Sequence, residues 1–302
     1  MNAPLVVIGG GPAGMAAAIE AARAGLACTL LDGAPRLGGQ IYRQPPREFR
    51  LMDGQTSARD YRRGQALRAE LATMGERIAL RPNTNVVGLE GRDLLWASHG
   101  SSGTLRAEQL VIAGGAYERP VPFPGWTLPG VMTAGGAQSL AKTMHVRPGD
   151  RALIAGTGPL LLVAANQLHQ AGVKIVALLE AGQPAWSLGL LPKVWGEWQL
   201  LRDAWDYWRG LRRARIPVHF NHTVFEAHGD GQVDAASYGP IDPATWRPLR
   251  EQTRRIDVDL LVVGFGLVPD TALSELAGCR HEYLHELGGW IPVRSRDMET
   301  SV

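Results

Sequence analysis

The sequence has little cysteine, and what it has is not arranged for redox or metal chemistry. Only two of its 302 residues are cysteine, Cys28 and Cys279, and no CxxC pair occurs. This excludes a disulfide scaffold, a four-cysteine metal site and thiol–disulfide exchange through a paired cysteine centre. So few cysteines fit a reducing compartment, and we expect a cytoplasmic location.

Long apolar runs and an excess of one charge are also lacking. The apolar run 153–165 is interrupted by Gly156, Gly158 and Pro159 and is too short to cross a bilayer, so we predict no transmembrane segment. No basic leader precedes the first apolar run, so we expect no signal peptide. The net charge of +2 argues against nucleic-acid binding. No HExxH motif or Cys/His cluster is present, and no metal site is predicted.

Glycine, in contrast, is abundant, with 37 residues, and some of it belongs to a pattern that occurs twice. Each copy has a short apolar run, a glycine turn, an alanine-rich helical stretch and a second apolar run that ends in an acid. The copies cover residues 6–32 and 153–180. Each copy predicts a β-α-β unit, so we expect an α/β protein with two Rossmann-like nucleotide-binding domains.

The segments between and after the copies suggest how the domains are connected. Alternation of β-prone runs and turns over 78–112 predicts a small antiparallel meander, and the Pro- and Gly-rich stretch 120–136 is typical of a domain crossing. The apolar strand 260–263 is expected to return the chain to the first domain. The predicted domains are residues 1–122, an inserted domain 123–255, and a return to the first domain over 256–302.

The first glycine motif has the context that dinucleotide binding requires. Gly9 allows a tight turn, Gly11 leaves room for a pyrophosphate, and Gly14 lets the helix pack closely on the strand. The first helical turn, at Pro12 and Ala13, offers unpaired N–H groups to phosphate. The carboxylate of Asp32, 23 residues after Gly9, suits a ribose hydroxyl. The alternative is a structural strand–turn–helix without a ligand.

The motif alone does not distinguish FAD from NAD, but the stretch after Asp32 does. Here the sequence resembles the two-dinucleotide-domain flavoproteins. More narrowly, it is similar to the FAD-containing subunits of opine oxidases, hydrogen cyanide synthase and dye-linked proline or hydroxyproline dehydrogenases. The resemblance covers nearly the whole chain, and its most specific stretches are residues 38–43, 115–120, 122–126 and 264–269.

The resemblance implies FAD as the cofactor and adds residues to the site. Gly39 and Gln40 would lie where such proteins bring the chain toward the flavin, with Tyr42 and Arg43 beside them. Ala113 and Gly114 would pass close to FAD, although Gly114 also fits a plain domain-crossing turn. Residues 84–86, including Val86, would lend backbone contacts to the adenine. No residue is assigned a catalytic role.

The second glycine motif keeps Gly156, Gly158 and an acid, Glu180, but has Leu161 where a third glycine is expected. The leucine would make the helix stand off from the strand or tilt. If a nicotinamide cofactor binds, Glu180 favours NAD over NADP, because a carboxylate repels a 2′-phosphate. The competing interpretation is a domain that keeps the fold but is vestigial or adapted to another nucleotide.

Two further stretches carry expectations. Trp195, Trp198, Trp205 and Trp208 have helical spacing and lie among arginines, which fits core packing, a docking face for a partner subunit, or membrane-surface binding. Residues 298–302 match a segment that leads, in the resembling proteins, into a strand and a Gly-Asp pair. We therefore expect a fragment or truncated product whose hold on FAD is weakened.

These observations favour an FAD-dependent electron-transfer subunit. Its partner, a second flavoprotein subunit, would oxidise a secondary amine or an amino acid. One alternative is a self-contained NADH-dependent flavin reductase. The other is a truncated, non-catalytic nucleotide-binding remnant.

Overall fold

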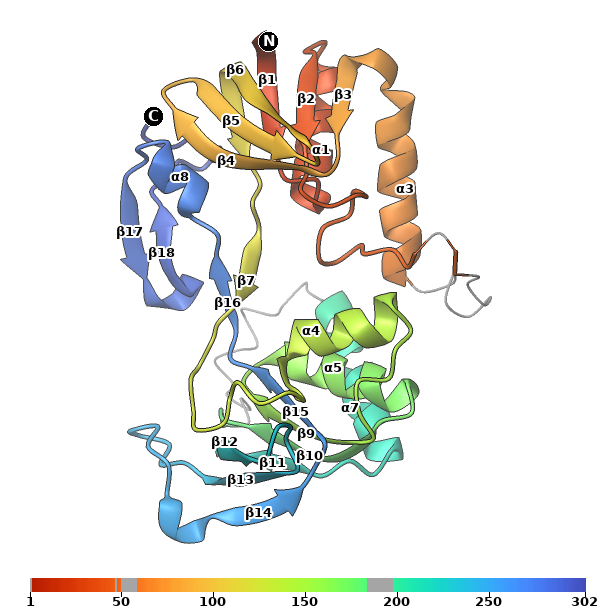
Figure 1. Cartoon of the computed structure of the whole chain (residues 1–302), viewed down its shortest axis with the longest axis vertical. Coiled ribbons are helices and arrows are strands. Elements are labelled where there is room, and N and C mark those ends of the chain that lie inside the picture. The colour runs from red at the N-terminus through yellow and green to blue at the C-terminus, as the bar shows by residue number, and fades with distance from the viewer. Residues whose placement is uncertain (1, 47, 50–58, 184–197) are drawn as a thin grey trace. The chain divides into compact units, whose positions relative to one another are not determined.

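The computed structural model describes residues 2–46, 48–49, 59–183 and 198–302 and has the α/β fold that the sequence predicts (Figure 1). The chain forms two compact units. One consists of residues 1–117 and 268–302, and the other of residues 118–267. The connections are the short strands β7 (Ala116–Glu118) and β16 (Leu267–Pro269), which pair with each other.

The first unit is built on six strands: β1 (Asn2–Ile8), β2 (Cys28–Leu31), β3 (Ile78–Arg81), β4 (Thr84–Glu90), β5 (Asp93–Ser98) and β6 (Ser101–Ile112). Their order in the sheet is β3-β2-β1-β6-β5-β4. The strands β3, β2, β1 and β6 run parallel, and β5 and β4 continue antiparallel. The predicted meander therefore starts one strand late. β3 follows a crossover helix and pairs parallel with β2.

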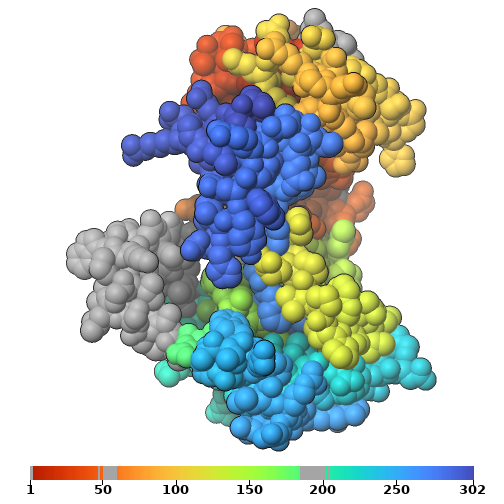
Figure 2. Space-filling view, turned by 90° about the vertical axis from the view of Figure 1, so that its left-hand side faces the viewer, coloured from red at the N-terminus to blue at the C-terminus, as the bar shows by residue number. Residues whose placement is uncertain are grey.

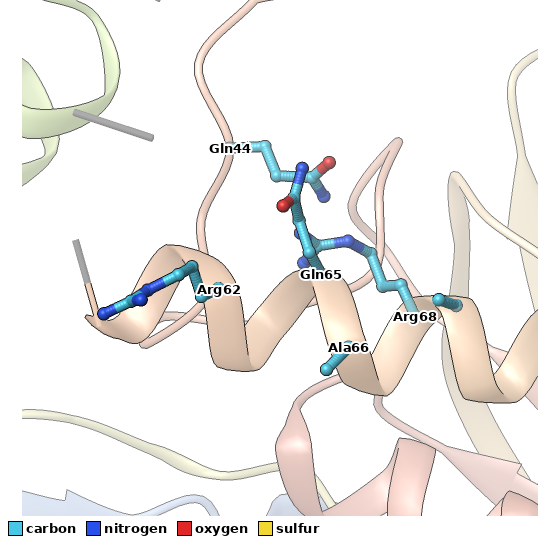
Figure 3. A pocket seen from close by; sticks show the side chains of 6 residues that line it. Gln44, Arg62, Gln65, Ala66 and Arg68 are labelled. Carbon is cyan, nitrogen blue, oxygen red and sulfur yellow. The ribbon is translucent and has the colours of Figure 1, made fainter. Parts of the chain in front are cut away.

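Alternate residues of β1 face opposite sides of this sheet, as a strand requires. Leu5 and Val7 pack under two helices, and Val6 and Ile8 pack on the other face with β5 and β6. The helices are α1 (Pro12–Arg23) and α3 (Arg59–Thr73). A pocket of about 560 Å³ opens along α3 (Figure 3).

The C-terminal part of the first unit adds a helix and a hairpin. They are α8 (Ala272–Leu276), β17 (His281–Leu284) and β18 (Gly289–Pro292). The rings of Tyr283 and Trp290 meet edge to face across the hairpin at 5.7 Å, and both are more than half exposed. Figure 2 shows this dark-blue part of the chain at the surface.

The second unit contains a five-stranded parallel sheet in the order β11-β10-β9-β15-β8. A three-stranded antiparallel sheet, β12-β13-β14, covers one of its faces. The strands are β8 (Val131–Thr133), β9 (Arg151–Gly156), β10 (Lys174–Glu180), β11 (Val218–Phe220), β12 (His222–His228), β13 (Ala235–Pro240), β14 (Arg254–Asp257) and β15 (Leu260–Gly264). The helices are α4 (Ala134–Gln138), α5 (Pro159–Gln170) and α7 (Trp198–Arg213).

One sequence expectation about this unit is wrong. The strand 260–263 does not return the chain to the first domain. As β15 it lies between β9 and β8 in the second sheet, where Leu261 pairs with Leu153 and with Val131. Its residues are buried on both faces, as is usual for an interior parallel strand. The chain leaves the second unit only afterwards, in β16.

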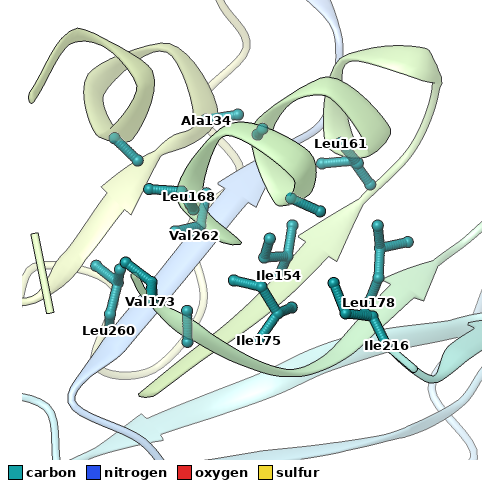
Figure 4. Close-up of a cluster of buried hydrophobic side chains, with 14 of the residues drawn as sticks. Ala134, Ile154, Leu161, Leu168, Val173, Ile175, Leu178, Ile216, Leu260 and Val262 are labelled. Carbon is teal, nitrogen blue, oxygen red and sulfur yellow. The ribbon is translucent and has the colours of Figure 1, made fainter. Parts of the chain in front are cut away.

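Leu161, which replaces the expected third glycine, is fully buried in the core between α5 and the sheet (Figure 4). It lies over Gly264 at the end of β15, where an added Cβ would be only 3.0 Å from Leu161 Cδ2. In the first unit the sizes are reversed, because the small Gly14 lies beside the Cβ of Ala113. The extra volume on the second helix is thus matched by a missing side chain on the neighbouring strand.

The tryptophan-rich stretch lies partly outside the described residues, which begin again at residue 198. Trp205 on α7 is 62% exposed, and Trp208 is half-buried, with its ring 6.5 Å from that of Phe220. The helix packs on α5 through Asn166, whose amide donates to Tyr207 O at 3.0 Å. No helix in the described part of the chain has both the length and the apolar character to cross a membrane.

The match between Leu161 and Gly264 can be tested by a double-mutant cycle. We expect Leu161→Ala to lower the free energy of unfolding by about 2–5 kcal/mol, because it leaves a cavity. Gly264→Ala adds a Cβ within 3.3 Å of Ala134 Cβ and should cost about 1–3 kcal/mol. In the double variant the new methyl group fills part of the cavity, so its cost should be below the sum by about 1 kcal/mol. Strict additivity in urea unfolding would contradict the match.

His219 on β11 should make the fold sensitive to acid. Its ring lies 5.4 Å from that of His222 and 6.5 Å from that of Tyr238. Burial, and then the charges of His222 and Arg254, lower the pKa of His219 below the ordinary 6.5. The unfolded chain therefore takes up this proton first, and stability is lost as the pH falls below about 6.5. His219→Asn should reduce the fall in the urea midpoint between pH 7.5 and 5.5, and an unchanged fall would contradict this role of His219.

Candidate cofactor-binding site

The turn between β1 and α1 is held by direct contact between backbones. Gly9 has φ +103°, and a Cβ there would overlap the carbonyl oxygen of Ala113 at the end of β6. A Cβ at Gly14 would overlap the carbonyl oxygen of Gly9. Ala113 in turn donates its N–H to Ile8 O at 2.8 Å. Gly9, Gly14 and Ala113 thus bring the helix and two strands together where side chains have no room.

Gly11 is different, because the described residues leave the space beside it open. It is the N-cap of α1, in an extended conformation that any residue can adopt, and the nearest atom to an added Cβ would be Gly39 Cα at 3.9 Å. Pro12 has no N–H, so Ala13 and Gly14 present the first open amides of the helix. No acid lies in the first turn. Space and N–H groups therefore coincide where an anionic phosphate can bind.

Asp32, at the carboxyl end of β2, is fixed beside this turn by its own hydrogen bonds. Its Oδ2 accepts from the N–H of Gly10, and its Oδ1 accepts from Ala34 N at 2.6 Å. Each carboxylate oxygen has a further lone pair, so Asp32 can still accept from a ribose hydroxyl. A side chain at Gly10, which lies between the first two glycines of the motif, would collide with Asp32 and with Leu37.

The structure also brings the stretch after Asp32 to the turn. Gly38 donates its N–H to Gly10 O at 2.8 Å, and an added Cβ on Gly39 would lie 2.9 Å from Gly11 Cα. Gln40 is exposed beside them, and its Oε1 accepts from the Arg43 guanidinium. Gly39 thus lies against the first glycine turn, with Gln40 next to it.

Two other predicted segments lie at the same edge of the sheet. Thr84 donates its N–H to Asp32 O at 2.8 Å, so β4, with the half-buried Val86, begins beside the end of β2. Gly114 follows Ala113 and is exposed. A Cβ added to Gly114 would lie 3.7 Å from Asp270 O. The sequence does not predict that Asp270 lies beside Gly114. The one feature of the sequence that points to Asp270 is its position directly after the stretch 264–269.

The second glycine turn keeps the spacing of the first but differs in detail: Leu161 replaces the third glycine, and Gly158 has φ +94° where Gly11 has φ −72°. Gly156 cannot carry a side chain, because a Cβ would overlap Gly264 O. Glu180 accepts from Gly182 N at 2.8 Å and from Gly158 N at 3.0 Å. Gly158 corresponds in position to Gly11, whereas Asp32 takes the amide of Gly10. In the second turn, then, the protein's own carboxylate occupies an amide that would otherwise be open to a phosphate.

Neither cysteine belongs to this site. Cys28 is buried in β2, and burial raises the pKa of its thiol. Cys279 is half-buried, and both are free thiols. Among the residues that the structure describes, no group of three His, Cys, Asp or Glu side chains could hold a metal ion.

Comparison with known proteins agrees with this geometry. The model of the pyridine nucleotide-disulphide oxidoreductase family matches residues 3–302. The chain is 41% identical over 288 residues to hydrogen cyanide synthase subunit HcnB of Pseudomonas aeruginosa, covering 94% of this chain and 61% of that protein. It is 33% identical over 310 residues to an opine oxidase subunit of Agrobacterium tumefaciens, covering 98% and 59%.

The chain therefore spans about three fifths of the length of these relatives. Among solved structures, thioredoxin reductase of T. acidophilum superposes with a TM-score of 0.69 at 21% identity, covering 100% of this chain and 87% of that one. The predicted resemblance and the two-domain fold are confirmed. The chain belongs to the pyridine nucleotide-disulphide oxidoreductase family.

Proposed function

We propose that the first unit binds FAD and that the chain is the electron-transferring subunit of a heteromeric enzyme that oxidises a secondary amine or an amino acid. The observation that carries the proposal is the open space at Gly11, bounded by Gly39 and by the free amides of α1. A bound flavin would supply the redox chemistry, while the protein binds and orients it.

The residues of the first unit have distinct roles in this proposal. Gly11, Ala13 and Gly14 hold the pyrophosphate through backbone N–H groups, and Asp32 binds the ribose. The backbone at Val86 contacts the adenine. At the other end of the cofactor, Gly39, Gln40, Ala113 and Gly114 line the flavin side. No group in the chain is assigned to proton transfer, so the substrate would be oxidised elsewhere in the complex.

The partner and the substrate class rest on the relatives. Both proteins named above are subunits, one of hydrogen cyanide synthase and one of opine oxidase. A role within a larger enzyme is therefore proposed for this chain too, with a second flavoprotein subunit carrying the substrate site. Opines, proline and glycine are amines that bear carboxylates, and compounds of this kind are the proposed substrates.

The second unit retains the fold of a dinucleotide domain, and we propose that its nucleotide site is weakened. Glu180 uses the amide of Gly158, and Leu161 fills the position of the third glycine. NADH-dependent reduction of the flavin is the rival function, since Gly156, Gly158 and Glu180 are all present.

Substitution of Gly11 separates binding from folding. Gly11→Val should lower FAD affinity about 100-fold, or about 2.7 kcal/mol, because the side chain occupies the phosphate space. The urea midpoint of the apoprotein should change little, since among the described residues, the two chain neighbours aside, the atom nearest to the new Cβ is Gly39 Cα at 3.9 Å. FAD titration followed by flavin fluorescence measures the affinity. Ala16→Val, on the exposed side of α1, is the control. Equal affinity of all three proteins would contradict the proposed site.

The rival function is tested on the FAD-loaded chain under anaerobic conditions. We expect NADH to leave the flavin absorbance unchanged, because one loop amide of the second unit is already taken by Glu180. Chemical reduction with dithionite is the positive control. Rapid bleaching by NADH would support the self-contained reductase instead.

A further inference from the structure

The pocket along α3 is lined mainly by long polar side chains, and its lining contains none of the residues of the glycine turn. It has a volume of about 560 Å³ and is lined by Gln44, Arg62, Gln65, Ala66, Arg68 and Ala69. Figure 3 shows Gln44, Gln65 and Arg68 close to one another, with Arg62 nearer the N-terminal end of the helix. Among the residues that the structure describes, the lining therefore has two guanidinium groups and two amides but no carboxylate.

Arg68 is the half-buried cation of this pocket, and its hydrogen bonds within the described residues go to neutral groups. Its Nη1 donates to two neutral carbonyl oxygens, Leu37 O at 3.5 Å and Tyr42 O at 3.4 Å, which are long hydrogen bonds. Burial lowers the pKa of Arg68, and the charge of Arg36 acts in the same direction. In the part of the chain that the structure describes, no carboxylate pairs with Arg68.

The acidic residue closest to Arg68 along α3, Glu70, forms its ion pair outside the pocket. Glu70 pairs with Arg23 at 2.5 Å. The two amides in the pocket retain donors, because Gln44 Nε2 uses one hydrogen on Leu37 O at 2.9 Å and Gln65 Nε2 one on Tyr61 Oη at 3.1 Å. A partly desolvated guanidinium with neighbouring amide donors is a favourable partner for a carboxylate or a phosphate.

We propose that this pocket binds a small oxyanion, a carboxylate or a phosphate, with the Arg68 guanidinium as its principal counter-charge. Gln44 and Gln65 donate further hydrogen bonds, and Arg62 adds positive charge at the rim. The bound anion also fixes the guanidinium between Leu37 and Tyr42, the two ends of the stretch that carries Gly39. Anion binding itself does not require FAD, so the two proposals can fail separately.

The test is calorimetric titration of the whole chain, without added FAD, with inorganic phosphate and separately with malonate, at constant ionic strength in chloride. Saturable binding of either anion is expected. Phosphate binding alone would assign the site to phosphate groups, and malonate binding alone to carboxylates. In Arg68→Gln the dissociation constant should rise at least tenfold, about 1.4 kcal/mol.

Two further variants make the result decisive. Gln65→Glu places a carboxylate in the pocket and keeps the hydrogen bonds of Arg68, so it should also weaken binding at least tenfold, whether or not Arg68→Gln folds. Arg63→Gln removes an exposed charge from the same helix outside the pocket and should bind like the unchanged protein. Absence of saturable binding, or equal loss in all three variants, would overturn the proposal.

Discussion

The architecture of the first unit depends on one steric constraint, the meeting of β1, α1 and β6 without intervening side chains. Gly9, Gly14 and Ala113 satisfy it, since a Cβ on either glycine would overlap a carbonyl oxygen. This close approach places the N-terminus of α1 at the carboxyl ends of the central strands. Asp32 and Gly39 lie beside it there. A methyl group at Gly14 would move the helix and with it every donor that faces the cofactor space.

The second unit meets the same constraint with different residues. A large Leu161 on the helix faces a glycine on β15, so the helix still packs on a filled core. The glycine pattern therefore reports on how two elements touch and only indirectly on whether a nucleotide binds. The position of Glu180 bears more directly on binding, because it determines which backbone amide remains open.

Sequence reasoning succeeded where local sterics are strict, and it failed where partners are distant. Gly9, Gly11 and Asp32 could be placed from spacing, because a tight turn and a strand end leave few alternatives. The pairing of β15 could not, since an apolar strand carries no information about which sheet it joins. Because Gly264 lies far along the chain from Leu161, the sequence did not reveal that this glycine makes room for the leucine. Arg68 was overlooked because it belongs to a polar helix whose residues look like a solvated surface.

The strand order of the second unit has a consequence for how the chain folds during its synthesis. β8 lies at the edge of its sheet beside β15, which is made only after the whole of β9 to β14. The six strands of the large sheet of the first unit, in contrast, are all complete by Ile112. A nascent chain can thus assemble its first sheet early, while β8 and one side of β9 wait unpaired for β15. Such late closure makes the second sheet the part most exposed to misassembly or aggregation during synthesis.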